Sequence, residues 1–152
     1  MLGGRGRARA RLLAIFGVME LRIEITGEIV ERQELLNGTQ TITIEGADAA
    51  GDWALVGALS WNLGLVEYEG EGDLTLTRAD GAEIFATLVR ADVAEAGDGI
   101  EDADHTFRLT YEIDGGAGAF LDATGAGSAQ GTLAGDAFHG AWSLRLAAPL
   151  AA

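Results

Sequence analysis

The twenty residues from Thr106 to Gly125, TFRLTYEIDGGAGAFLDATG, decide the fold that we expect for this chain. Apolar and polar side chains alternate strictly from Thr106 to Asp114, and a period of two is typical of a half-buried β-strand. We predict that this strand stops at Asp114-Gly115-Gly116, because glycine adopts the positive φ of a tight corner without a Cβ clash. A buried aromatic residue, Phe120, and a second short strand follow. The stretch therefore predicts β-structure with glycine corners, and it specifies no reaction.

Similar alternation and turn signals recur along the chain after Met19. Trp53 to Gly64 is mostly apolar and fits either a strand or a buried lid, and Gly70 and Gly72 mark a bulge or sharp coil inside a strand. Short strands joined by short turns are typical of a sandwich or a closed barrel. Closure removes exposed sheet edges, so we expect one all-β domain, a single closed eight-stranded antiparallel barrel of calycin-like form with an apolar interior. The predicted strands lie near residues 20–31, 39–46, 53–59, 65–77, 83–91, 106–114, 127–133 and 138–147.

The run YEIDGGAGAF (residues 111–120), followed by Gly125 and Gly127, resembles the strand–GGxGxF–strand signature of the allene oxide cyclase and dirigent-protein barrels. The segment YEGEGD (residues 68–73) is similar to a GEGD-type segment of that group, and GTLAGDAFHGAWSLRL resembles its final hairpin. The resemblance covers roughly residues 66–147. It implies an eight-stranded antiparallel barrel with an apolar cavity, often trimeric, that guides cyclisation or coupling of hydrophobic small molecules. The family's catalytic residues match no position here, so the resemblance carries over no catalytic role.

The charge of the chain disfavours several kinds of partner. Ten arginines, no lysine and 24 acidic residues give a net charge of −14. Four of these arginines lie in the first eighteen residues, which hold no acid, so residues 19–152 carry a net charge of −18. Such an acidic body repels phosphate groups, so we expect no nucleic-acid partner and no docking on anionic membranes. The absence of cysteine excludes disulfides, thiol catalysis and thiolate metal ligands.

The opening segment MLGGRGRARARLLAIFGV (residues 1–18) joins a basic run to a short apolar run. It imitates a signal peptide, but the apolar run is short and no small-x-small cleavage site follows it. It is also far too short to span a bilayer. We expect a flexible or mis-annotated extension, with Met19 as the natural beginning of a barrel domain (residues 19–152) and a cytoplasmic location. Export or docking through this segment is the alternative.

The apolar face of the predicted strands is the candidate ligand site. An eight-stranded barrel is just wide enough to be filled by side chains or to hold one small ligand. Small residues at Gly70, Gly72, Ala86 and Gly140 would leave room for a ligand. Burial of apolar ligand surface would stabilise the complex by about 25 cal/mol per Å². The simpler interpretation is an ordinary core. The predicted interior comprises Ile23, Ile25, Ile42, Ile44, Tyr68, Leu74, Leu76, Phe107, Leu109, Tyr111, Phe138, Trp142 and Leu144. The predicted substrate contacts are Tyr68, Phe107, Trp142, Phe138, Leu76, Trp53 and Trp61.

Three residues are the candidates for chemistry, namely Tyr111, Glu69 and Glu71. The acidic residues between Glu67 and Asp73 stand two apart, hence on one strand face, and alternation with Tyr68 puts that face outside. A bulge at one of the neighbouring glycines would turn a carboxylate inward, where apolar surroundings raise the pKa and suit it to acid or base catalysis.

We expect neither a metal nor a cofactor. His105 and His139 are too few for a three-histidine zinc site, and both flank loops, so we expect exposed histidines. The acidic loop from Asp92 to Asp104 lacks the spacing of an EF-hand. The motif GGAGAF opens no predicted helix, which a dinucleotide site needs.

Our first functional hypothesis is a cofactor-independent cyclase or isomerase acting on a hydrophobic small molecule. Such an enzyme accelerates ring closure by holding the substrate in a reactive shape, and orientation of that kind is worth roughly several kcal/mol. The alternatives are a barrel that binds or carries an apolar ligand without catalysis, and a structural or dirigent-like partner with no chemistry of its own. We also expect association of copies into a dimer or trimer. A barrel packed solid by side chains would remove the first two hypotheses.

Overall fold

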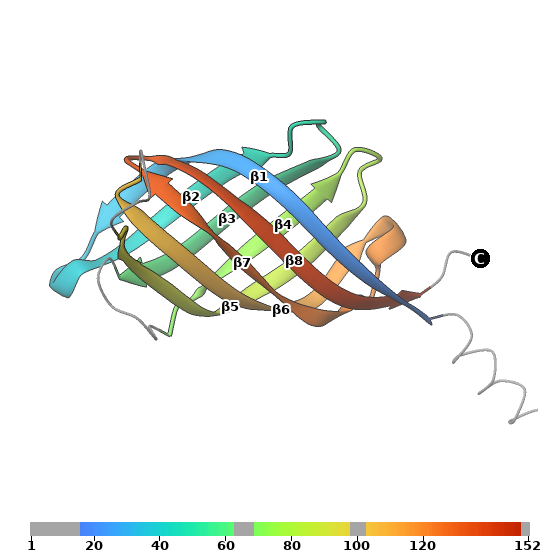
Figure 1. The fold of residues 1–152 in the computed structure, drawn as a ribbon. Coiled ribbons are helices and arrows are strands. Elements are labelled where there is room, and N and C mark those ends of the chain that lie inside the picture. The colour runs from blue at the N-terminus through green and yellow to red at the C-terminus, as the bar shows by residue number, and fades with distance from the viewer. Residues whose placement is uncertain (1–15, 63–68, 98–102, 150–152) are drawn as a thin grey trace, which may run out of the picture.

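The computed structural model describes residues 16–62, 69–97 and 103–149, and these residues form one closed antiparallel β-barrel (Figure 1). In this part of the chain the strands follow one another around the barrel in sequence order, and β1 closes it against β8. The strands are β1 (Phe16–Glu34), β2 (Thr39–Ala47), β3 (Trp53–Asn62), β4 (Gly72–Arg78), β5 (Glu83–Glu95), β6 (His105–Ala117), β7 (Thr124–Ala134) and β8 (Ala137–Pro149), with two short 3-10 turns, η1 (Leu36–Gly38) and η2 (Gly118–Phe120). The predicted eight-stranded all-β barrel is confirmed.

The side chains that alternate in the sequence point alternately into the barrel and out to its surface. In β6, the apolar residues from Phe107 to Ile113 are buried, while Arg108, Thr110 and Glu112 between them are exposed. Every residue predicted to point inward is buried, except Tyr68, which lies outside the described residues. The predicted interior is therefore confirmed wherever the structure describes it.

The glycine corner lies later in the chain than we predicted. Strand β6 continues through Gly115 and Gly116 to Ala117, and the chain turns only at η2. Gly115 has a φ of 134°, and the pairing of β5 with β6 shifts register beside it, between Ile84 and Ala86. Gly116 pairs with Ile84 and has no positive φ. The prediction of a strand end was wrong because a β-bulge and a tight turn both use glycine with positive φ.

Other strand boundaries also differ from the prediction. Strand β1 begins at Phe16, which pairs with Pro149, so residues 16–18 belong to the barrel and not to the preceding extension. The run from Trp53 is strand β3 and not a lid. Strand β4 begins only at Gly72, and residues 69–71 are not strand. The earlier part of that predicted strand, like residues 1–15, falls largely outside the described residues.

The two ends of the barrel are closed differently. At one end, the plug end, lie the turns at residues 48–52, 79–82 and 118–123, beside the start of β1 and the end of β8 (Figure 1). There the buried ring of Phe120 lies 6.0 Å from the ring of Trp53, and the guanidinium of Arg78 lies 4.9 Å from the Phe120 centroid. Arg78 also hydrogen-bonds Asp80, which lowers the pKa of that carboxyl to about 2. An aromatic side chain therefore closes the plug end.

Candidate functional site

The opposite end of the barrel, which we call the network end, is closed by polar side chains. It holds the turns at residues 35–38 and 135–136, the last residues of β3 and β5 and the first residues of β4 and β6. Gln40 is only 3% exposed there. Its Oε1 accepts hydrogen bonds from Trp61 Nε1 at 3.0 Å and Arg32 Nη1 at 3.2 Å, and its Nε2 donates to Glu34 Oε1 at 3.3 Å. Both polar atoms of the buried amide therefore have partners, which burial requires.

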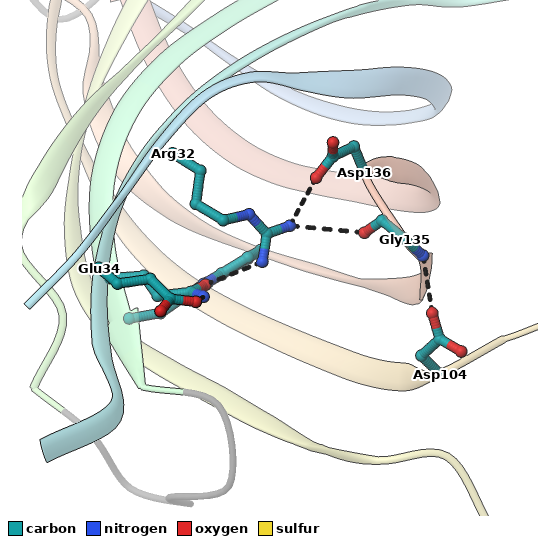
Figure 2. A network of polar contacts seen from close by, with 7 residues as sticks. Arg32, Glu34, Asp104, Gly135 and Asp136 are labelled. Carbon is teal, nitrogen blue, oxygen red and sulfur yellow. Dashed lines mark hydrogen bonds and ion pairs between the residues drawn. The ribbon is translucent and has the colours of Figure 1, made fainter.

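Arg32 connects this buried amide to the turn between β7 and β8 (Figure 2). Its Nη2 donates to Asp136 Oδ1 at 2.8 Å and lies 3.5 Å from the Gly135 carbonyl oxygen. The Gly135 amide donates in turn to Asp104 Oδ2 at 2.7 Å. The side chain of Asp136 is 69% exposed, so the ion pair itself stabilises the fold little. Its effect is to join β1, the start of β6 and the final hairpin at one end.

An aromatic cluster lies on β6 and β8, and two of its members, Phe107 and Phe138, stand close to the starts of these strands at the network end. The rings of Phe107 and Phe138 lie 5.9 Å and 5.8 Å from the ring of Trp142, measured between centroids. Trp142 is 1% exposed, and among the described residues its Nε1 is the one buried side-chain nitrogen or oxygen without a hydrogen-bond partner. An unpaired buried donor of this kind costs about 1–3 kcal/mol. The interior thus presents a donor that no described group of the protein satisfies.

Tyr111 has a different environment, although it is equally buried. Its hydroxyl donates to the Ser143 carbonyl at 3.0 Å, with the Ser128 carbonyl at 3.4 Å. Burial raises the pKa of Tyr111 well above its ordinary value. The ring lies over Gly127, where a Cβ would stand only 2.6 Å from Tyr111 Cε2. The hydroxyl therefore donates to backbone carbonyls of the barrel wall, and its raised pKa disfavours ionisation near neutral pH.

The two candidate carboxylates lie outside the apolar interior. Glu69 and Glu71 are both exposed, as the alternation predicts. The Glu71 carbonyl accepts from the Ser60 amide at 2.7 Å, and the Glu71 amide donates to Ser60 Oγ at 3.1 Å. The backbone of this segment therefore lies against the end of β3. The inward carboxylate that an acid–base mechanism would need is supplied by neither residue.

The predicted substrate contacts do not form one site. Phe107, Phe138 and Trp142 come together in the aromatic cluster. Trp61 belongs to the network end, and Trp53 packs at the plug end. The remaining contacts are Leu76, which is buried in the general core, and Tyr68, which lies outside the described residues.

The small inward residues do not leave the room that we expected. A Cβ on Gly140 would stand 2.9 Å from Phe107 Cζ, and one on Gly70 would stand 2.7 Å from Leu88 Cδ2. At Gly72 the carbonyl oxygen of Ala58 would be 2.3 Å away. Neighbouring side chains and backbone atoms therefore occupy the space beside these glycines. A shallow hollow of about 580 Å³ lies instead on the outer face, with Ser128 and Ser143 in its lining.

The described residues give no sign of a metal centre. His139 is exposed, with Nδ1 2.8 Å from Thr26 Oγ1 and Nε2 3.4 Å from Glu24 Oε2. No group of three or more potential metal ligands gathers anywhere in residues 16–62, 69–97 and 103–149. The glycine motif leads into the short turn η2 and not into an α-helix. Over the same residues, we find no helix with the length and apolar character needed to cross a bilayer.

The sequence analysis missed the polar cluster at the network end. Gln40 shares strand parity with the inward residues Ile42 and Ile44, so alternation placed this amide inside the barrel. A polar residue at an inward position is the signal that could have found it. Its partner Arg32 lies on β1 beyond the bulge between Ile29 and Glu31, which reverses the simple parity of that strand.

Comparison with known proteins assigns neither a family nor a function to this chain. No family model, no curated protein and no solved structure matches the chain. The fold and the candidate site described above therefore rest on the residues of this chain alone.

Proposed function

We propose that the barrel binds a hydrophobic small molecule among its inward side chains, next to the aromatic cluster of Phe107, Phe138 and Trp142. The observation that carries this proposal is the continuous apolar interior of a closed barrel. The aromatic cluster is part of this interior, and hydrogen bonds between polar side chains close the network end. The mouths of β-barrels are common places for apolar ligands. Burial of roughly 200 Å² of apolar ligand surface would contribute about 5 kcal/mol.

The ligand must displace side chains, because the small inward positions are already filled. The three rings of the cluster contact one another, and moving them breaks no hydrogen bond of the described residues. The opposite end offers less freedom, since Phe120 is held between Trp53 and Arg78. We therefore assign the ligand to the half of the barrel that faces the network end.

Binding without catalysis is the form of the proposal that the geometry supports best. Tyr111, Glu69 and Glu71 supply no acid or base to the interior. A cyclase or isomerase remains the second candidate, since ring closure by substrate shaping needs neither group. The unpaired indole N–H favours it, because a fixed donor in a dry site stabilises negative charge on a reacting oxygen. The filled positions at Gly70, Gly72 and Gly140 favour the third candidate, a structural barrel without a ligand.

Two alanines on β7 allow a matched test. Ala129 is fully buried and pairs with Trp142 and Leu109, whereas Ala126 on the same strand is exposed. We expect saturable quenching of tryptophan emission by camphor, an apolar probe. Ala129→Leu should weaken camphor binding at least about tenfold, equivalent to about 1.4 kcal/mol. Ala126→Leu should leave it unchanged.

Thermal unfolding of each variant separates loss of binding from loss of fold, because overpacking a core costs about 1–3 kcal/mol. Equal camphor affinity in two folded variants would place the probe outside the barrel. Absence of saturable binding to the unaltered protein would leave the structural barrel as the better candidate.

A further inference from the structure

We infer that the indole N–H of Trp142 is the polar anchor of the ligand, which is therefore a neutral, largely apolar molecule carrying a hydrogen-bond acceptor oxygen. This inference rests on the proposed function, and it adds the chemical class of the ligand. Tryptophan Nε1 can only donate. Its natural partner is a carbonyl, ether or similar oxygen brought into the interior.

The first support comes from comparing the buried indoles. Trp61 and Trp142 are both almost completely buried. The chain provides Gln40 as an acceptor for Trp61, 3.0 Å from its Nε1. It provides no acceptor among the described residues for Trp142. Since nearly all buried polar groups in folded proteins have a partner, the missing partner of Trp142 points to an acceptor beyond the described residues, and we assign that acceptor to a bound molecule.

The surroundings of Trp142 also restrict what that molecule can be. Its register neighbours are Ile23 on β1 and Ala129 on β7, and its ring contacts are Phe107 and Phe138. Among the described residues, the buried polar side chains are Gln40 and Asn62, and no buried residue is charged. A carboxylate or an ammonium group would therefore be buried without an opposite charge, which is strongly unfavourable. A neutral acceptor avoids that penalty and satisfies the donor.

Isotope labelling of tryptophan gives a direct test, because each of the three tryptophans contributes one indole N–H resonance. Two matched probes are camphor and 2-methylenebornane, in which a CH₂ group replaces the carbonyl oxygen. Trp142→Phe identifies the resonance of interest by its loss. The matched control, Trp53→Phe, removes a tryptophan at the plug end, away from the proposed anchor.

We expect camphor, and not 2-methylenebornane, to move the Trp142 indole resonance downfield, as hydrogen bonding does. Camphor should bind about fivefold to tenfold more tightly than the hydrocarbon, as one net hydrogen bond predicts. This ratio should disappear in Trp142→Phe and persist in Trp53→Phe. If Trp142→Phe does not fold, Trp53→Phe and Trp61→Phe assign the resonance by elimination, and the two probes on the unaltered protein decide.

The other outcomes overturn the inference in distinguishable ways. Equal binding of both probes with an unmoved Trp142 resonance would refute the anchor and leave apolar binding intact. A shift confined to the Trp61 or Trp53 resonance would place the acceptor elsewhere and also refute it. Absence of saturable binding by either probe would overturn the anchor together with the proposed function.

Discussion

Tyr111 and Trp142 show how one hydrogen bond separates a structural residue from a binding residue. Both are buried aromatic side chains that carry a single polar atom. The Tyr111 hydroxyl has backbone acceptors on β7 and β8, and the Trp142 N–H has none among the described residues. Strand parity predicted that both residues point inward. It could not predict these partners, because the acceptors of Tyr111 lie 17 and 32 residues away and meet it only when the barrel closes.

Tyr111→Phe tests the structural assignment. The change removes one hydroxyl and almost no volume, so we expect a loss of about 1 kcal/mol in the free energy of unfolding, measured by urea denaturation. Camphor affinity should not change, since the hydroxyl is already bonded to the Ser143 carbonyl. Tyr111→Ala, which empties the ring position, should cost about 3–5 kcal/mol. Weakened camphor binding in a fully stable Tyr111→Phe variant would contradict this assignment and indicate that the hydroxyl contacts the ligand.

The burial of Tyr111 should also affect how the stability of the protein depends on pH in alkaline solution. Burial raises the pKa of Tyr111 in the folded state, whereas an unfolded tyrosine has a pKa of about 10. Above about pH 10 the unfolded chain therefore loses this proton while the folded chain keeps it, so stability falls as the pH rises. The free energy of unfolding should decrease less steeply above pH 10 in Tyr111→Phe than in the unaltered protein. Parallel decreases in the two proteins would argue against a buried, neutral phenol.

At the scale of the element, β6 shows both the strength and the limit of the sequence pattern. The alternation from Phe107 to Ile113 is realised residue by residue. The glycines after it were assigned to a turn, although the strand passes through them by a bulge. The sequence does not distinguish these cases, because the pairing of β6 with β5, and not the local composition, decides whether the chain continues.

Gly116→Val should destabilise the protein, although Gly116 has no positive φ. A Cβ at this position would stand 2.4 Å from the carbonyl oxygens of both Glu83 and Phe120, and backbone atoms cannot easily move aside. We expect a loss of about 1–3 kcal/mol in thermal or urea unfolding, as overpacking typically costs. Gly97→Val is the matched control, with no atom within 4 Å of its Cβ, and should stay within about 0.5 kcal/mol. Equal stabilities of the two variants would show that β6 does not approach η2 this closely.

The whole molecule combines a closed barrel with a large excess of negative charge. Closure of the barrel was predictable, because eight short strands without features that protect an exposed sheet edge are expected to close on themselves. The different closures of the two ends were not predictable, because they join turns that are distant in sequence, such as Arg32 with Asp136. The net charge of −14 adds a repulsion that no single contact reveals.

Salt should therefore stabilise this protein. The Debye length falls from about 30 Å at 0.01 M to about 10 Å at 0.1 M ionic strength, so sodium chloride screens repulsion across the barrel. Salt also weakens attractive ion pairs, but those of the described residues have exposed partners and contribute little. We expect a higher midpoint of thermal unfolding at 0.1 M than at 0.01 M sodium chloride. A lower midpoint at 0.1 M would mean that attractive pairs outweigh the net charge.

The central claim, that an apolar molecule binds inside the barrel, is tested most directly by nuclear Overhauser contacts between camphor and the methyl groups of the protein. Inward and outward methyl groups alternate along each strand, so the pattern of contacts locates the probe. The account predicts contacts to the inward residues Ile23, Leu109 and Ala129, which surround Trp142 or its register neighbours. Contacts confined to the outward residues Ala126 and Val56 would contradict it.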